Sequence, residues 1–199
     1  MPKFCALLGM GCLALCLQAQ AQEADWAELA ELPPATATAT ADLVAGATPA
    51  RLGTALAGAW RGSLTYRDYG SGKKVVLPTS ASVTVAADAT LEVGFIYDDG
   101  PGKTVRSNDT WALSADGRSL RMKRDQLDVS DYRAGTGADL LLVVLGTGTE
   151  NGTPVQVRMV VLRRGDALTI SRATQQPDQA WLLRHRYAFT LERPGASDR

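Results

Sequence analysis

The chain has 199 residues, of which 45% are hydrophobic, 6% aromatic and 21% charged, and its 21 basic residues balance 21 acidic ones. A protein that binds nucleic acid or a membrane surface would show a strong basic excess, so this balance argues against both classes. The three cysteines, Cys5, Cys12 and Cys16, all lie near the N-terminus.

The N-terminus has the three parts of an export signal. Lys3 supplies a positive charge, residues 4–17 form an apolar run, and an A-x-A cleavage site ends at Ala21. The run is shorter than the roughly eighteen apolar residues expected of a membrane-spanning helix, and no later segment comes closer. We therefore predict a signal peptide over residues 1–21, a periplasmic or secreted protein, and no transmembrane segment.

Cleavage after Ala21 would remove every cysteine, which excludes disulfides and a catalytic thiol from the mature chain. It would also remove Lys3 and leave 20 basic residues against 21 acidic ones. The alternative is a lipid anchor on Cys16. Because a bulky Leu15 precedes that cysteine, the site matches an acylation motif only in part, and we favour cleavage.

Residues 22–47 are predicted to be a flexible Ala/Thr-rich segment with a short helix around Trp26. Thr48-Pro49 then has the pattern of an N-cap followed by proline in the first helical turn. The sequence therefore predicts a second short helix, which ends near Gly58 and opens a β-barrel domain over residues 48–199.

From Trp60 onward, apolar and polar residues alternate, which is typical of strands with one buried face. The alternation is clearest near the C-terminus, where the odd-numbered residues from Trp181 to Leu191 share an apolar face. Short turns such as Asn151-Gly152 separate the strands, so neighbouring strands must run antiparallel. The predicted strands are 59–69, 73–86, 90–98, 103–114, 118–126, 139–149, 153–164, 167–175 and 180–192.

A meander of about nine strands would expose two sheet edges, and closure into an up-and-down barrel removes both. We therefore predict an all-β fold: an antiparallel barrel preceded by a short helix.

Two motifs resemble the calycin group of barrels, which includes the lipocalins. Gly58-Ala59-Trp60 follows the predicted helix and is similar to the G-x-W motif of the first lipocalin strand, and Ser130-Asp131-Tyr132 resembles T-D-Y. In that group the Trp plugs the closed end of the barrel and a late Arg packs across it. The resemblance implies structural roles for Gly58 and Trp60, with Arg184 or Arg186 as the arginine. It also implies a cavity for a small, mostly apolar ligand at the end away from Trp60.

His185 is the only histidine, so the sequence offers no multi-histidine metal site and only one base for a Ser-His-Asp triad. No G-x-S-x-G elbow accompanies it. Asp125, Asp128 and Asp131 lack the alternate spacing and glycine turn of a calcium loop. We predict no catalytic residue, no metal and no cofactor, and the alternative role of His185 is a core ring bonded to a backbone carbonyl or to Tyr66.

The predicted function is non-catalytic binding of a small hydrophobic or amphipathic ligand in an internal cavity. The alternative is a cell-envelope scaffold or inhibitor module with a solid core that binds a protein, and the sequence identifies no such partner. Tyr66 or His185 would orient a polar group of the ligand. Strand phase alone places these candidate residues in the cavity: Leu64, Tyr66, Phe95, Tyr97, Trp111, Met159, His185 and Tyr187.

Overall fold

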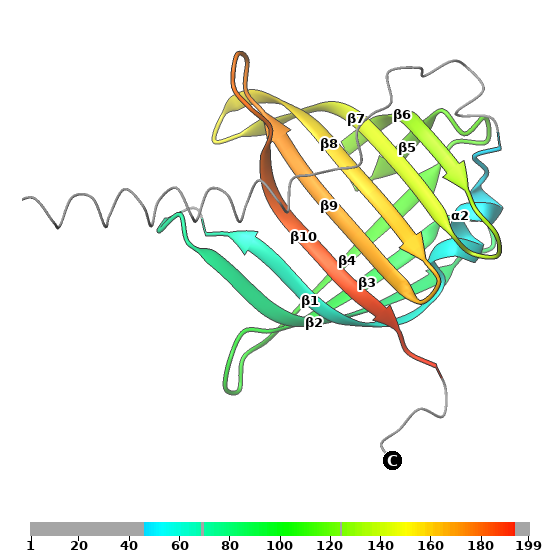
Figure 1. Ribbon diagram of the computed structural model, residues 1–199, viewed down its shortest axis with the longest axis horizontal. Coiled ribbons are helices and arrows are strands. Elements are labelled where there is room, and N and C mark those ends of the chain that lie inside the picture. Colours follow the sequence, from blue (N-terminus) through cyan, green and yellow to red (C-terminus); the bar gives the residue numbers. More distant parts are fainter. Residues whose placement is uncertain (1–45, 69, 124, 194–199) are drawn as a thin grey trace, which may run out of the picture. The chain divides into compact units, whose positions relative to one another are not determined.

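The computed structural model describes residues 46–68, 70–123 and 125–193 (Figure 1). The predicted signal peptide, the candidate anchor Cys16 and residues 22–45 of the predicted flexible segment lie outside the described residues. In the described part of the chain, no helix has the length and apolar character needed to cross a bilayer.

A short helix, α2 (Pro49–Leu56), precedes the first strand, as predicted. Thr48 caps it, because its side-chain oxygen accepts a hydrogen bond of 3.2 Å from the backbone N–H of Arg51. Gly58 follows the helix with φ 137°, and a Cβ there would lie 2.8 Å from the side chain of Leu191. Only glycine meets both conditions, so Gly58 allows the helix to turn directly into the first strand.

The all-β prediction is confirmed: a meander of antiparallel strands closes into a barrel. Each strand pairs with its neighbours in sequence, and the first pairs with the last, so the barrel leaves no open edge. The strands are β1 (Gly58–Arg67), β2 (Lys74–Val85), β3 (Leu91–Asp98), β4 (Thr104–Leu113), β5 (Ser119–Met122), β6 (Asp125–Ala134), β7 (Leu140–Glu150), β8 (Thr153–Arg164), β9 (Ala167–Gln175) and β10 (Leu182–Leu191).

The barrel has ten strands where the sequence predicted about nine. The predicted strand 118–126 is divided, with β5 ending at Met122 and β6 beginning at Asp125. Lys123 makes the turn with φ 44°, without the glycine or proline that marks most turns. A register shift between Val129 and Asp131 then interrupts the alternation of apolar and polar residues in β6. The sequence pattern therefore does not predict β6 as a separate strand.

The two ends of the barrel differ (Figure 1). Helix α2 lies at one end, which we call the helix end. The β1–β2 and β7–β8 hairpins lie at the other, which we call the hairpin end. In the β7–β8 hairpin, Asn151 and Gly152 both have positive φ, as a two-residue hairpin turn requires.

Trp60 closes the helix end. Its side chain is fully buried, and Nε1 donates a hydrogen bond of 2.9 Å to the carbonyl of Leu56 in α2. The guanidinium of Arg163 lies 5.1 Å from the centre of the indole ring. Arg163 also donates to the carbonyl of Ala55 at 2.5 Å and to that of Gly165 at 2.9 Å, so the arginine joins α2, β8 and the Trp60 ring.

The arginine over Trp60 is therefore Arg163, in place of Arg184 or Arg186, which the resemblance suggested. The reason is the direction of the strands. β10 starts at the hairpin end, so Arg184 and Arg186 lie near the start of this strand and far from Trp60. β8, by contrast, ends beside α2. The end of β8 therefore brings Arg163 to Trp60.

The three residues of the T-D-Y-like segment, Ser130-Asp131-Tyr132, have different surroundings. Ser130 falls in the β6 bulge and donates a hydrogen bond to the carbonyl of Val143, whereas Asp131 pairs with Arg133 at 2.8 Å. Tyr132 is buried in the hydrophobic core with an unpartnered hydroxyl. Burial raises the pKa of Tyr132, and the charge of Arg51 in α2 opposes this.

Candidate functional site

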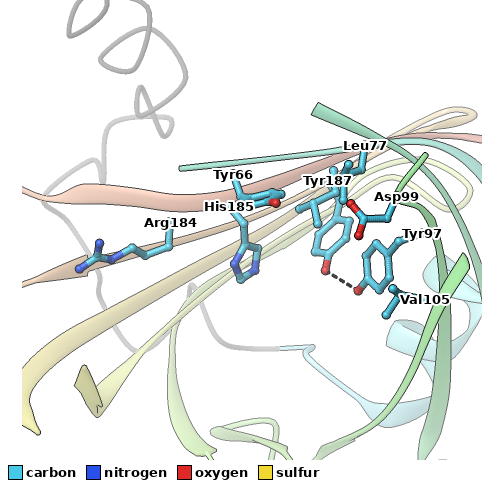
Figure 2. Close-up of a pocket in the computed structure, with 9 residues that line it drawn as sticks. Tyr66, Leu77, Tyr97, Asp99, Val105, Arg184, His185 and Tyr187 are labelled. Carbon is cyan, nitrogen blue, oxygen red and sulfur yellow. Dashed lines mark hydrogen bonds between the residues drawn. The ribbon is translucent and has the colours of Figure 1, made fainter. Parts of the chain in front are cut away.

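Two cavities occupy the barrel interior toward the hairpin end, and Figure 2 shows the residues that line the outer one. The outer cavity has a volume of about 340 Å³ and the inner cavity about 180 Å³. Tyr97, His185 and Tyr187 line both, so the cavities adjoin at these three side chains. The lumen at this end is therefore hollow, unlike the packed helix end.

The eight predicted cavity residues all line one or both of these cavities. Leu64 and Tyr66 line the outer cavity. Phe95, Trp111 and Met159 line the inner cavity, and the remaining three are the shared residues Tyr97, His185 and Tyr187. Inward strand phase thus brings together residues from β1, β3, β4, β8 and β10.

Sequence reasoning missed several residues that line the cavities, including a serine and an aspartate of the inner one. β4 points Ser107 and Asp109 inward in the same phase as Trp111, so that phase was the signal that would have found them. Alternation alone assigns polar residues such as these to the solvent-exposed face of a strand, so it does not predict that they face the lumen. The other missed residues are Leu77, Asp99, Val105 and Arg184 in the outer cavity, and Met122, Lys123, Ile170 and Arg172 in the inner one.

Four aromatic rings form a column along the lumen. Phe95 and Tyr187 stack with centroids 4.9 Å apart, and Tyr97 and Phe189 extend the column at 6.1 and 5.5 Å. The hydroxyls of Tyr97 and Tyr187 hydrogen-bond to each other at 2.9 Å (Figure 2). Burial and this bond raise the pKa of Tyr187, so its phenol stays neutral, and the hydrogen-bonded pair forms a partition where the two cavities meet.

His185 lies beside this column. Its ring meets Tyr187 edge-on, with centroids 5.5 Å apart. Burial lowers the pKa of His185 to about 4, and the charge of Arg172 contributes. Among the described residues no hydrogen bond joins it to Tyr66 or to a backbone carbonyl, so the ring is a neutral polar group on the cavity wall.

A bulge in β10 changes which residues face the lumen. The register shifts between Leu183 and His185, and Leu183 pairs with Ala173. Both residues are buried, but neither is part of the main cluster of buried hydrophobic side chains. The predicted shared face therefore breaks at Leu183, and Arg184 turns inward to line the outer cavity.

Arg184 joins a polar cluster at the hairpin end. Its Nε donates to the hydroxyl of Thr174 at 2.8 Å, and its Nη2 pairs with Glu150. The Thr174 hydroxyl also donates to Glu150 at 3.1 Å. At the inner cavity, Arg172 pairs with Asp125 at 2.9 Å. These contacts satisfy charged groups that would otherwise be costly to place inside a barrel.

The inner cavity holds a serine, a histidine and an aspartate, but their hydrogen bonds do not form a triad. Ser107 bonds to the Tyr97 hydroxyl at 3.3 Å, and Asp109 accepts from Nε1 of Trp111 at 3.3 Å. In the described residues no hydrogen bond joins His185 to either of them, whereas nucleophilic catalysis needs that contact. The described residues also contain no group of three or more His, Cys, Asp or Glu side chains that could hold a metal.

No family model matches the chain, and a search of curated proteins finds no significant relative. The fold and the site therefore define its class: a closed antiparallel β-barrel, capped by a short helix at one end and hollow at the other.

Proposed function

We propose that this protein is an exported, non-catalytic barrel that binds a small hydrophobic or amphipathic ligand in its lumen. The observation that carries the proposal is the pair of adjoining cavities, whose walls are mainly aromatic and aliphatic side chains. Aromatic walls with a few inward polar groups are typical of small-molecule sites. Burial of an apolar ligand there would contribute about 25 cal/mol per Å² before the costs of association.

Three features support a relationship to the calycin group. The short helix α2 precedes β1, Trp60 is buried beneath it, and an arginine packs across the indole. The arginine comes from β8 in place of the last strand, which is a departure from the expected pattern. The proposed cavity lies away from Trp60, where that resemblance implies a ligand.

Three polar side chains at the inner cavity contact aromatic residues, which is the arrangement that the binding proposal uses. Ser107 and Asp109 are each engaged with an aromatic side chain, and His185 contacts Tyr187 through its ring. With a pKa of about 4, His185 would be a weak base at neutral pH. Its role in the proposal is to offer a ring nitrogen to a polar group of the ligand.

The proposal can be tested by filling the mouth of the lumen. Val105 lines the outer cavity and is 44% exposed, so Val105→Trp should fold and obstruct entry. Arg106 is the next residue on β4 and points to the exterior, which makes Arg106→Trp the matched control. Native mass spectrometry of the wild-type protein, purified from the exporting compartment, should show a co-purified small molecule.

We expect Val105→Trp to reduce the ligand-bound fraction at least several-fold and Arg106→Trp to leave it unchanged. Equal loss in both variants, or no small molecule in any preparation, would count against lumen binding. A stable protein complex in place of a small molecule would favour the scaffold alternative.

The exported location rests on the N-terminal sequence. The same spectra test it, because the intact mass distinguishes a chain cleaved after Ala21 from one acylated on Cys16. A chain that retains Met1 and carries no lipid would contradict both forms of export.

A further inference from the structure

The charged groups of the lumen are mostly paired. Arg172 at the inner cavity pairs with Asp125, and Arg184 pairs with Glu150 at the hairpin end. At the mouth, Asp99 lines the outer cavity and pairs with Lys103. In these three pairs, protein groups already neutralise one another.

The carboxylate of Asp109 differs from the charged groups of these three ion pairs. It lines the inner cavity, and within the described residues it makes no ion pair. Its Oδ1 accepts from the backbone N–H of Thr110 at 2.8 Å, and its Oδ2 accepts from Nε1 of Trp111 at 3.3 Å. These two bonds hold the carboxylate in place, so the charge is oriented before any ligand arrives.

The charge of Asp109 acts on the lumen, where it contributes to the raised pKa of Tyr187. A partly buried carboxylate without a cation is unfavourable, and a cationic ligand would relieve that cost.

The side chains around Asp109 favour the binding of an organic ammonium group. Phe95, Tyr97, Trp111 and Tyr187 line the same cavity, together with the sulfur-containing side chain of Met159. Aromatic rings attract organic ammonium groups through their electron-rich faces, most strongly where water is excluded. Trp111 is only 2% exposed, so this side of the cavity is well shielded from solvent.

Other charged groups face the same cavity. The Arg172 guanidinium is compensated by Asp125 at 2.9 Å, and His185 is neutral near pH 7. Lys123 lies on the turn between β5 and β6, where it is exposed, and its long flexible stem lets the ammonium group reach water. Asp109 is therefore the charge that is both oriented and uncompensated inside the cavity.

We propose that the inner cavity binds the ammonium group of an amphipathic organic cation, with Asp109 as its counter-ion and the aromatic rings as its walls. The apolar tail of the ligand would then lie in the outer cavity against Leu64, Leu77 and Val105. This inference rests on the proposed function, and it specifies that the amphipathic ligand carries a positive charge.

Three probes with the same ten-carbon tail separate the contributions of charge and tail: decyltrimethylammonium, decanol and decanoate. Each is titrated into the full-length protein by calorimetry at pH 7, below its micelle concentration. We expect the ammonium probe to bind about tenfold more tightly than the other two, which corresponds to about 1.4 kcal/mol.

Asp109→Asn keeps the size of the side chain and an oxygen that can accept from Trp111, but removes the charge. It should abolish the preference for the ammonium probe and leave the affinity for decanol unchanged. Asp128→Asn is the control, because Asp128 is an exposed carboxylate on β6 opposite Ser119 and does not line either cavity.

Equal affinity of the wild type for all three probes would overturn the charge inference and leave lumen binding intact. Tighter binding of decanoate would also overturn it, with Lys123 or Arg172 as the dominant charge. If none of the three probes binds, the proposed function itself fails.

Discussion

The helix end and the hairpin end of this barrel both contain aromatic and arginine side chains, but these side chains are packed at the helix end and line cavities at the hairpin end. At the helix end, Trp60 and Arg163 are buried and bonded to the carbonyls of α2 and of the β8–β9 turn. At the hairpin end, Arg184 and Tyr187 surround cavities and bond to other side chains. Close packing at one end stabilises the barrel, and this allows the other end to keep open volume.

The comparison also separates two kinds of aromatic residue. The side chain of Trp60 is fully buried, because α2 covers it and Arg163 lies against its ring. Tyr97 and Tyr187 keep part of their surface toward a cavity and hold their position through a mutual hydrogen bond. Substitutions at the two ends should therefore have different effects on stability and on ligand access.

The largest effect is expected at Trp60. Trp60→Ala would leave a cavity beneath α2 and remove the bond to Leu56, so we expect unfolding free energy to fall by about 3–5 kcal/mol. Urea denaturation measures this loss. Tyr66→Ala, at the outer cavity, should cost about 1 kcal/mol or less. Equal losses in the two variants would contradict the division between a packed end and a hollow end.

A smaller effect is expected at Arg163. Arg163→Met would leave the carbonyls of Ala55 and Gly165 without their donor, which should cost about 2 kcal/mol in urea denaturation. The neighbouring Arg164→Met is the control, because Arg164 is exposed and should change stability by about 0.5 kcal/mol or less. If both variants match the wild type, Arg163 does not help to close the helix end.

At the hairpin end, His185 should make stability depend on pH. Burial lowers its folded-state pKa from 6.5 to about 4, so the unfolded chain binds the proton first as pH falls. Stability should therefore decrease from about pH 6.5 toward pH 4, by roughly 1 kcal/mol, a value reduced from the full shift because the ring borders a cavity.

His185→Gln removes this titration and leaves the carboxylates in place. The measurement is urea unfolding of both proteins at pH 7 and pH 4, with the difference between them assigned to His185. Identical pH profiles would mean that the ring is solvated rather than buried.

An effect on stability of about the same size as that of His185 is expected at Tyr97. Tyr97→Phe loses the hydroxyl that bonds to Tyr187 and Ser107, so stability should fall by about 0.5–1.5 kcal/mol in urea denaturation. A lumen probe should also exchange faster, because the partition between the cavities is weakened. Tyr66→Phe is the control, since no side-chain hydrogen bond of Tyr66 is seen in the described residues; an equal change there would argue against the partition.

Several features could be predicted because they depend on neighbours in sequence. Thr48 and Pro49 mark the start of α2 through local capping chemistry. Period-two alternation predicts which side chains face inward, and the eight candidate residues that share this phase line the two cavities. The short turns require antiparallel neighbours, and unpaired edges make closure the expected result.

Other features depend on contacts between distant segments. The turn at Lys123 lacks a glycine signal, and the bulges in β6 and β10 shift the strand phase without a mark in composition. The β10 bulge is what turns Arg184 inward. The pairing of Asp125 with Arg172 joins residues 47 positions apart, so no spacing rule predicts it.

Alternation and capping are local properties, so the amino-acid sequence is enough to predict the class of fold, the helix before the barrel and the inward face of most strands. Three features depend on the folded structure: Arg163 covers Trp60, Asp109 lies in an aromatic cavity, and the lumen is hollow at the hairpin end. Those outcomes follow from strand register and direction, which bring side chains from distant strands to the same depth in the barrel.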